Sequence, residues 1–113
     1  SVAGGSGSDT LWFKDDSTFA DLRGSSVFSG IDVIDLHALN TLTGNQVTLN
    51  AAEVTAMSDA NVLTVNGSGH DSLLLSAADG WVPSSEILGY TTYTSATGAV
   101  VNAQDTLHYV SMV

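Results

Sequence analysis

Short runs of apolar and β-branched residues, separated by Gly, Asn, Asp and Ser, dominate the chain. They predict strands over residues 10–13, 33–36, 46–49, 62–65, 72–75, 90–95, 98–101 and 106–113. Several of these runs are apolar at consecutive positions, which predicts strands that are covered on both faces. The runs recur roughly every 10 to 15 residues. This spacing favours a mostly β fold, either a short-stranded β-solenoid or a β-sandwich-like domain.

One short α-helix is predicted near residues 51–58. Asn50 is a suitable N-cap, and Glu53 follows it at the spacing of a capping box. The segment itself is rich in alanine, the best helix former. Residues 76–81 begin in a similar way, but Gly80 and Pro83 limit this second segment to about one turn.

A glycine-rich nonapeptide, GGSGSDTLW, occupies residues 4–12. It fits the repeat G-G-x-G-x-D-x-U-x, in which U is a large apolar residue. Glycines allow a tight turn whose carbonyl oxygens face inward, and the aspartate adds carboxylate oxygens. Six to eight oxygen ligands suit calcium. We therefore expect Gly5, Gly7 and Asp9 to form part of a calcium site.

A weaker copy, NGSGHDSLL, occupies residues 66–74 and makes Asp71 a second candidate calcium ligand. The alternative interpretation is an ordinary glycine-rich turn between two strands. Asp9 and Asp71 are 62 residues apart (71 − 9), so the two copies are not consecutive turns. Since a single nonapeptide supplies about half of a site, we expect residues preceding this chain to complete the first one, and weak binding without them.

The charge of the chain excludes several classes of partner. The chain has twelve acidic and two basic residues, which gives a net charge of −10. Nucleic-acid binding needs Lys and Arg for the phosphates, and anionic lipid surfaces also attract basic proteins. No apolar run reaches the ~18 residues of a membrane helix, so we expect no membrane insertion. The absence of cysteine excludes disulfides and thiolate ligands.

No arrangement typical of catalysis stands out. His37, His70 and His108 lack the spacing of metal ligands. The chain also has no G-x-S-x-G nucleophile elbow. We expect the protein not to be an enzyme, and we assign no catalytic residue.

The remaining carboxylates are interpreted mainly as surface groups. On a strand, Asp32 and Asp35 point to opposite faces and would not bind one ion together. Asp35 could approach Asp9 or Asp71 if the chain winds as a solenoid. The simplest interpretation of residues 15–16 is a solvated turn.

Four aromatic residues leave two interpretations open. Trp12, Trp81, Tyr90 and Tyr93 could form a platform on which sugars stack. In the plainer interpretation Trp81 closes the core and the two tyrosines pair across a hairpin.

Several stretches together resemble the C-terminal region of bacterial RTX-type giant adhesins, which leave the cell by type I secretion. The resemblance begins at GGSGSDTLWF, continues from GIDVIDL through TLNAAEVTAMSDANVLTVNGSGHDSLLL to ADGWV, and fades towards YTTYTSATGAVV. It implies that residues 1–12 end a turn of an RTX β-roll and that residues 13–113 form a single β-rich domain.

The resemblance also implies a function. The chain would be a structural, calcium-associated module of a secreted, extracellular protein on the bacterial cell surface. Its partners would be the upstream RTX repeats of the same chain, the type I secretion machinery and a cell-surface ligand. Calcium outside the cell is concentrated enough for weak sites, so folding can wait until export. The alternative function is a carbohydrate- or peptide-binding adhesin module that uses exposed aromatic residues.

Overall fold

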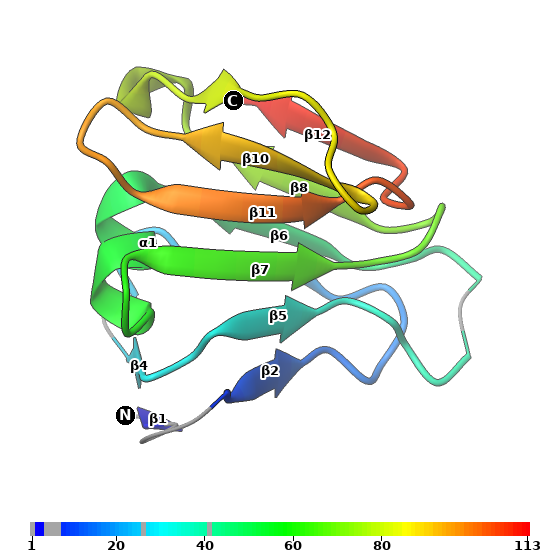
Figure 1. The fold of residues 1–113 in the computed structure, drawn as a ribbon. Coiled ribbons are helices and arrows are strands. Elements are labelled where there is room, and N and C mark those ends of the chain that lie inside the picture. The colour runs from blue at the N-terminus through cyan, green and yellow to red at the C-terminus, as the bar shows by residue number, and fades with distance from the viewer. Residues whose placement is uncertain (1, 4–7, 26, 41) are drawn as a thin grey trace.

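Two facing sheets form the computed structural model, which describes residues 2–3, 8–25, 27–40 and 42–113 (Figure 1). The chain passes from one sheet to the other after most strands, except that β9, β10 and β11 follow one another in the same sheet and that β1 and β4 form a separate pair. The six-stranded sheet contains four parallel neighbours and then two antiparallel strands, and the four-stranded sheet is parallel throughout. In spatial order the six-stranded sheet is β2 (Thr10–Trp12), β5 (Val33–Asp35), β7 (Val62–Asn66), β11 (Val100–Gln104), β10 (Tyr90–Thr94) and β9 (Val82–Pro83). The four-stranded sheet is β3 (Phe19–Asp21), β6 (Gln46–Leu49), β8 (Ser72–Leu75) and β12 (Tyr109–Met112).

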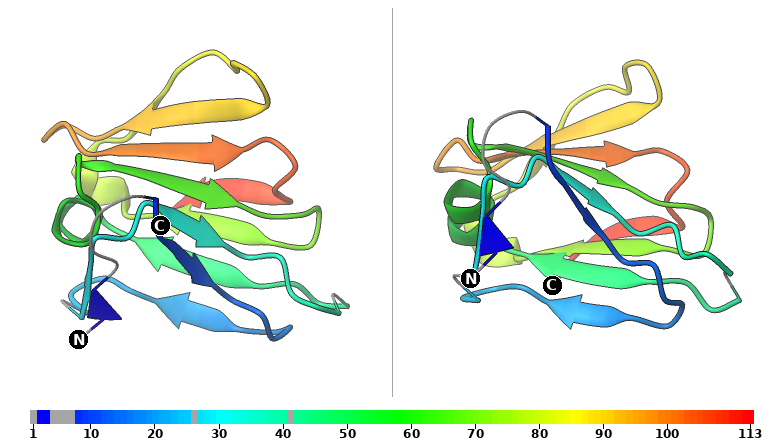
Figure 2. Two further views of the ribbon diagram at one scale, coloured as in Figure 1. Left: turned by 60° about the horizontal axis from the view of Figure 1, so that its bottom comes forward. Right: turned by 90° about the horizontal axis from the view of Figure 1, so that it is seen from below.

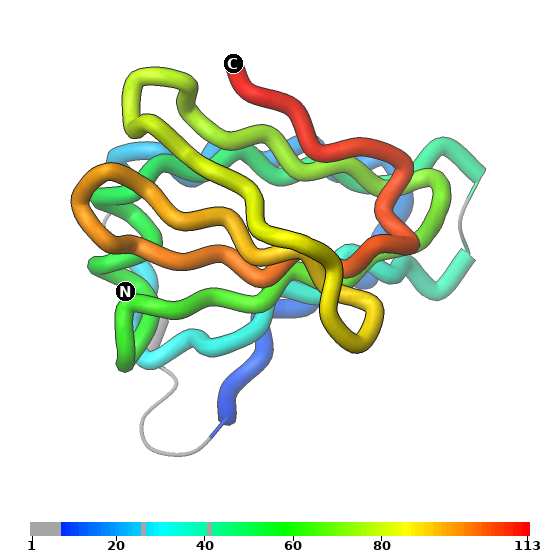
Figure 3. The backbone as a smooth tube through the Cα atoms, turned by 45° about the horizontal axis from the view of Figure 1, so that its top comes forward, coloured from blue at the N-terminus to red at the C-terminus, as the bar shows by residue number. Residues whose placement is uncertain are grey.

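The core lies between the two sheets, as the views from below and from above show (Figures 2 and 3). Equivalent residues of neighbouring strands are in register, so apolar side chains stack in rows. Ile34 on β5 lies opposite Val65 on β7, and Val47 on β6 lies opposite Leu73 on β8. All four are fully buried. The rows explain why strands of only three to five residues are sufficient: each one adds its apolar residues to a shared interior.

One helix, α1 (Ala51–Met57), covers the end of the molecule where the chain passes from β6 to β7 (Figure 1). Asn50 caps it, because its Oδ1 accepts the Glu53 amide at 2.8 Å. Val54 and Met57 point into the core and are fully buried. The single turn η1 (Ala77–Asp79) is also present. The predicted mostly β class and both helical segments are therefore confirmed.

Several details differ from the sequence predictions. The short strands β3, β9 and the β1–β4 pair (Val2–Ala3 with Phe28–Ser29) were not predicted, since each is too short to show a pattern. The six-stranded sheet is not covered on both faces, because Val62 on its outer face is 37% exposed. The other outward positions of β7, Thr64 and Asn66, are polar.

The structure agrees with the plainer interpretation of the aromatic residues for Trp81 but not for the two tyrosines. Trp81 is buried and belongs to the core. Tyr90 and Tyr93 do not pair with each other across a hairpin, because both lie on β10. Their partners on β11 are Gln104 and Val101, respectively. Tyr93 packs against the core, whereas Tyr90 forms part of the wall of a groove on the outer face.

Candidate functional site

Asp9 lies immediately before β2, next to a second carboxylate. Its amide donates to Asp32 Oδ2 at 3.1 Å, and its carbonyl accepts the amides of Asp32 at 2.9 Å and Val33 at 3.1 Å. Asp9 Oδ2 is buried and accepts no hydrogen bond from the described residues. A buried carboxylate oxygen without a donor is costly unless a cation or water satisfies it. The unpartnered oxygen makes Asp9 a candidate cation ligand, with Asp32 as the neighbouring carboxylate.

Only part of the predicted site can be compared with the structure. Gly5 and Gly7 lie outside the described residues, as does Gly4. Asp32 was not predicted to join Asp9, yet it precedes β5 as Asp9 precedes β2. In parallel strands, equivalent positions stack. Both aspartates directly precede a strand, and this common position was the signal in the sequence that could have identified Asp32 as the neighbour of Asp9.

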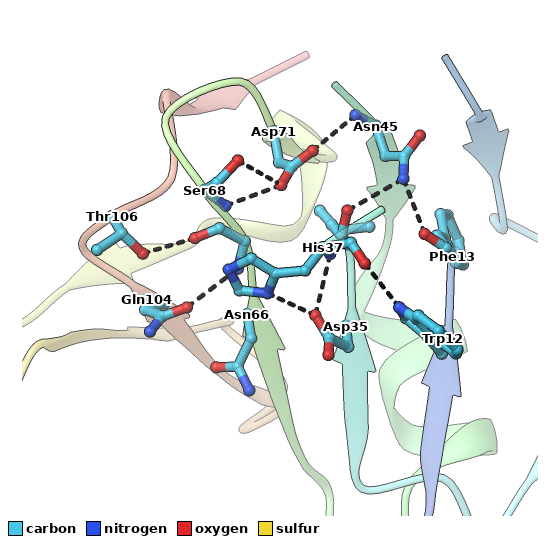
Figure 4. A network of polar contacts seen from close by, with 12 residues as sticks. Trp12, Phe13, Asp35, His37, Asn45, Asn66, Ser68, Asp71, Gln104 and Thr106 are labelled. Carbon is cyan, nitrogen blue, oxygen red and sulfur yellow. Dashed lines mark hydrogen bonds and ion pairs between the residues drawn. The ribbon is translucent and has the colours of Figure 1, made fainter. Parts of the chain in front are cut away.

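The expectation that Asp35 approaches Asp9 or Asp71 is wrong. Asp35 lies in register with Trp12 on one side and Asn66 on the other. Its Oδ1 accepts the His37 amide at 3.0 Å and lies 2.6 Å from His37 Nδ1, within hydrogen-bond distance (Figure 4). Asp35 is paired with Trp12, which lies three residues after Asp9 in the chain. Asp35 therefore lies further along its strand than Asp32, the residue that contacts Asp9.

Asp71 is fully buried and holds two turns together (Figure 4). Its Oδ1 accepts the Asn45 amide at 2.7 Å. Its Oδ2 accepts the amide and the hydroxyl of Ser68 at 2.8 and 3.0 Å. Because the two sheets run in opposite directions, Asp71 before β8 and Asp9 before β2 lie at opposite ends of the molecule (Figure 1). The structure does not bring them together, and a calcium ligand at Asp71 stays a prediction.

Asp71 belongs to a polar column, which we define as Thr18, Asn45, Asp71 and His108. Each precedes one strand of the four-stranded sheet. The Thr18 amide donates to Asn45 Oδ1 at 2.8 Å, and the His108 amide donates to the Asp71 carbonyl at 2.8 Å. The Asn45 carboxamide also donates to two backbone carbonyls, both at 3.0 Å. The polar column thus ties each turn to the next.

Asp16 lies in a turn, as the sequence indicated, but its carboxylate also binds a neighbouring turn. Its carboxylate accepts the amides of Leu42, Thr43 and Gly44 at 3.1, 2.9 and 2.7 Å. These hydrogen bonds, above all that from Thr43, hold the pKa of Asp16 below its ordinary value of 3.8. Asp16 therefore fastens the first turn to the second.

This depressed pKa predicts a pH dependence. The stabilisation is complete above the ordinary pKa of 3.8 and is lost as the pH falls through the lower, folded-state pKa. In an NMR titration, the Asp16 carboxyl and the Thr43 and Gly44 amides should report one common midpoint below 3.8. Asp16→Asn should remove this titration from both amide signals. Amide signals that titrate unchanged in the variant would contradict the assignment.

The other histidines are exposed and lie in turns. The His70 carbonyl approaches Gly44, and the His108 ring is tilted against the Tyr109 ring, with centroids 5.2 Å apart. Among the described residues, no three His, Cys, Asp or Glu side chains gather into a group that could hold a metal ion by themselves. A cation at Asp9 and Asp32 would need further oxygen ligands from backbone or water.

Comparison of the chain with protein-family models, with curated proteins and with solved structures finds no match. No helix in the described part of the chain is long and apolar enough to cross a membrane.

Proposed function

We propose that this chain is a structural, calcium-associated module of an exported, RTX-type surface protein, and that its two sheets form a short parallel β-roll. One coil of the roll would consist of one strand from each sheet. The pairs β2 with β3, β5 with β6, β7 with β8 and β11 with β12 follow this order in both sheets. The β10–β9 hairpin and α1 would then be insertions between coils.

The buried Asp9 Oδ2, which accepts no hydrogen bond from the part of the chain that the structure describes, carries the calcium part of the proposal. Asp9 and Asp32 would hold the ion through carboxylate oxygens, and the glycine turn before Asp9 would add carbonyl oxygens, as the sequence motif predicts. Bound calcium supplies positive charge that offsets carboxylate repulsion in a chain of net charge −10. Asp71 is left out, because both its oxygens already accept protein hydrogen bonds.

The unpaired edges of β2 and β3 support further repeats of the same chain as the partner. β2 and β3 are the terminal strands of their sheets, and both lie at the same end of the stack. Their aromatic residues are poorly covered, since Trp12 is 47% exposed and Phe19 is 67% exposed. A preceding coil of the same chain would pair with both strands and cover these rings. The type I secretion machinery would act on the chain before it folds, which fits folding that waits for external calcium.

Thermal melting with and without calcium tests the proposal. We expect 10 mM Ca²⁺, a concentration on the order of 10 Kd for a weak extracellular site, to raise the melting midpoint of a longer chain that includes the preceding sequence. The 113-residue chain should respond much less. Magnesium, which requires a smaller octahedral shell, is the matched control. Equal responses to the two ions, or no response in either chain, would remove calcium from the proposal.

A further inference from the structure

The outer face of the six-stranded sheet carries a groove that the calcium proposal does not use. Its volume is about 530 Å³, and it is lined by Thr64, Ile87, Leu88, Tyr90, Thr92 and Asn102. Sites for small molecules have volumes of roughly 300 to 1,000 Å³. None of the lining side chains is charged, although the protein carries a net charge of −10.

The floor of the groove is a row of polar side chains held in register. Thr64 on β7 lies opposite Asn102 on β11, and Asn102 lies opposite Thr92 on β10. The Thr92 hydroxyl donates to Asn102 Oδ1 at 2.7 Å, which fixes the carboxamide. Among the described residues, neither the Asn102 Nδ2 group nor the Thr64 hydroxyl has a hydrogen-bond partner. The floor therefore offers fixed, uncharged groups to a ligand that carries hydroxyls or carbonyls.

The walls of the groove are formed by one aromatic and two aliphatic side chains. The Tyr90 hydroxyl donates to Asn66 Oδ1 at 2.6 Å, which fixes the ring at one side. Ile87 and Leu88 are 68% and 94% exposed. Together they provide surfaces for the C–H face of a ring.

Leu88 adopts a backbone conformation that leucine disfavours. It has a φ of +54°, and Gly89 after it has a φ of +85°. The Ile87 and Tyr90 backbones close the turn with hydrogen bonds in both directions, at 2.8 and 3.1 Å. Such two-residue hairpin turns favour Asn or Gly at both positions. A leucine held in this strained conformation and exposed to solvent indicates a functional requirement for its side chain.

We propose that the groove binds one or two rings of a neutral carbohydrate, with ring hydroxyls on Asn102 and Thr64 and a C–H face against Tyr90 and Leu88. An added peptide strand fits less well, because it needs an unpaired strand edge. β7, β11 and β10 are each paired on both sides. Glu86, which precedes the lining residue Ile87 in the chain, and the net charge of −10 disfavour anionic sugars. This inference is independent of calcium.

The test is a ¹⁵N NMR titration of the chain with glucose, galactose, N-acetylglucosamine and their neutral β1→4 disaccharides at millimolar concentrations. At least one probe should shift the Asn102 side-chain NH₂ signals and the Leu88 amide. Asn102→Ala should weaken binding of that probe about tenfold, the loss of one neutral hydrogen bond. Gln46→Ala, a carboxamide removed from β6 in the other sheet, should leave the affinity unchanged.

Two further measurements make the result specific. Leu88→Gly should raise the melting midpoint, because it relieves the positive φ, and should weaken binding. Raising NaCl to 1 M should not change the affinity for a neutral ligand. The proposal is overturned if no sugar shifts these signals, if Gln46→Ala weakens binding as much as Asn102→Ala, or if a tryptic digest of casein shifts the signals while the sugars do not.

Discussion

Gly44→Ala is expected to destabilise the protein by about 3 kcal/mol or more, lowering the melting midpoint by at least about 10 °C. Gly44 has a φ of +94°, in the left-handed region that side chains disfavour. A Cβ there would lie 1.8 Å from the His70 carbonyl oxygen and 2.4 Å from its carbonyl carbon. These are backbone atoms of the next stacked turn, so the contact cannot be relieved by a rotamer change. Differential scanning calorimetry measures the loss.

Gly98→Ala is the matched control. Gly98 has almost the same φ, +91°, but a Cβ there would meet nothing within 4 Å. This variant should show only the cost of the left-handed conformation, about 1–2 kcal/mol. The difference between the two variants isolates the close stacking of two turns. Equal melting midpoints would contradict that packing.

Asp71→Ala is the second change with a large expected effect. It leaves the buried Asn45 amide and the Ser68 amide without their acceptors. Each lost acceptor costs about 1–3 kcal/mol, so urea denaturation should give a free energy of unfolding lower by about 3–5 kcal/mol. The backbone amide of Asn45 should also lose protection in hydrogen exchange, because it donates only to this carboxylate.

Asp59→Ala, which removes an exposed carboxylate, should change the stability by less than about 0.5 kcal/mol. The comparison is made in calcium-free buffer. A large loss there would assign Asp71 to the fold. If Asp71→Ala is as stable as the parent protein without calcium and fails to respond to it, Asp71 is instead a ligand, as the glycine motif in the sequence predicts.

The sequence predicted those elements whose signals are local. Residues 46–49 and 72–75 match β6 and β8 at both ends, because each apolar run is bounded by polar or turn residues. The helix was also predicted well, since the Asn50 cap and Glu53 are three residues apart. The last strand begins at Tyr109 rather than at residue 106, because residues 105–108 turn the chain between sheets.

Most polar contacts of the site were not predicted, because they join residues that are distant in the sequence. Asp16 bonds to amides 26 to 28 residues away, and Asp9 meets Asp32 across 23 residues. Which residues meet depends on the strand register, and the loops between strands differ in length, so no fixed period shows it. Asp35 is an example. It lies three residues after Asp32, so its partner on β2 is Trp12 and not Asp9.

Terbium luminescence tests most directly whether Asp9 is a cation ligand. Tb³⁺ replaces calcium at oxygen sites and emits when a nearby excited tryptophan transfers energy to it. Trp12 is three residues from Asp9, within roughly 10 Å along an extended chain. In a longer chain that includes the preceding sequence, we predict tryptophan-sensitised emission that calcium displaces, that Asp9→Asn and Asp32→Asn strongly reduce, and that Asp59→Asn leaves intact. Absent emission, or emission equal in all three variants, would contradict a cation at the glycine turn.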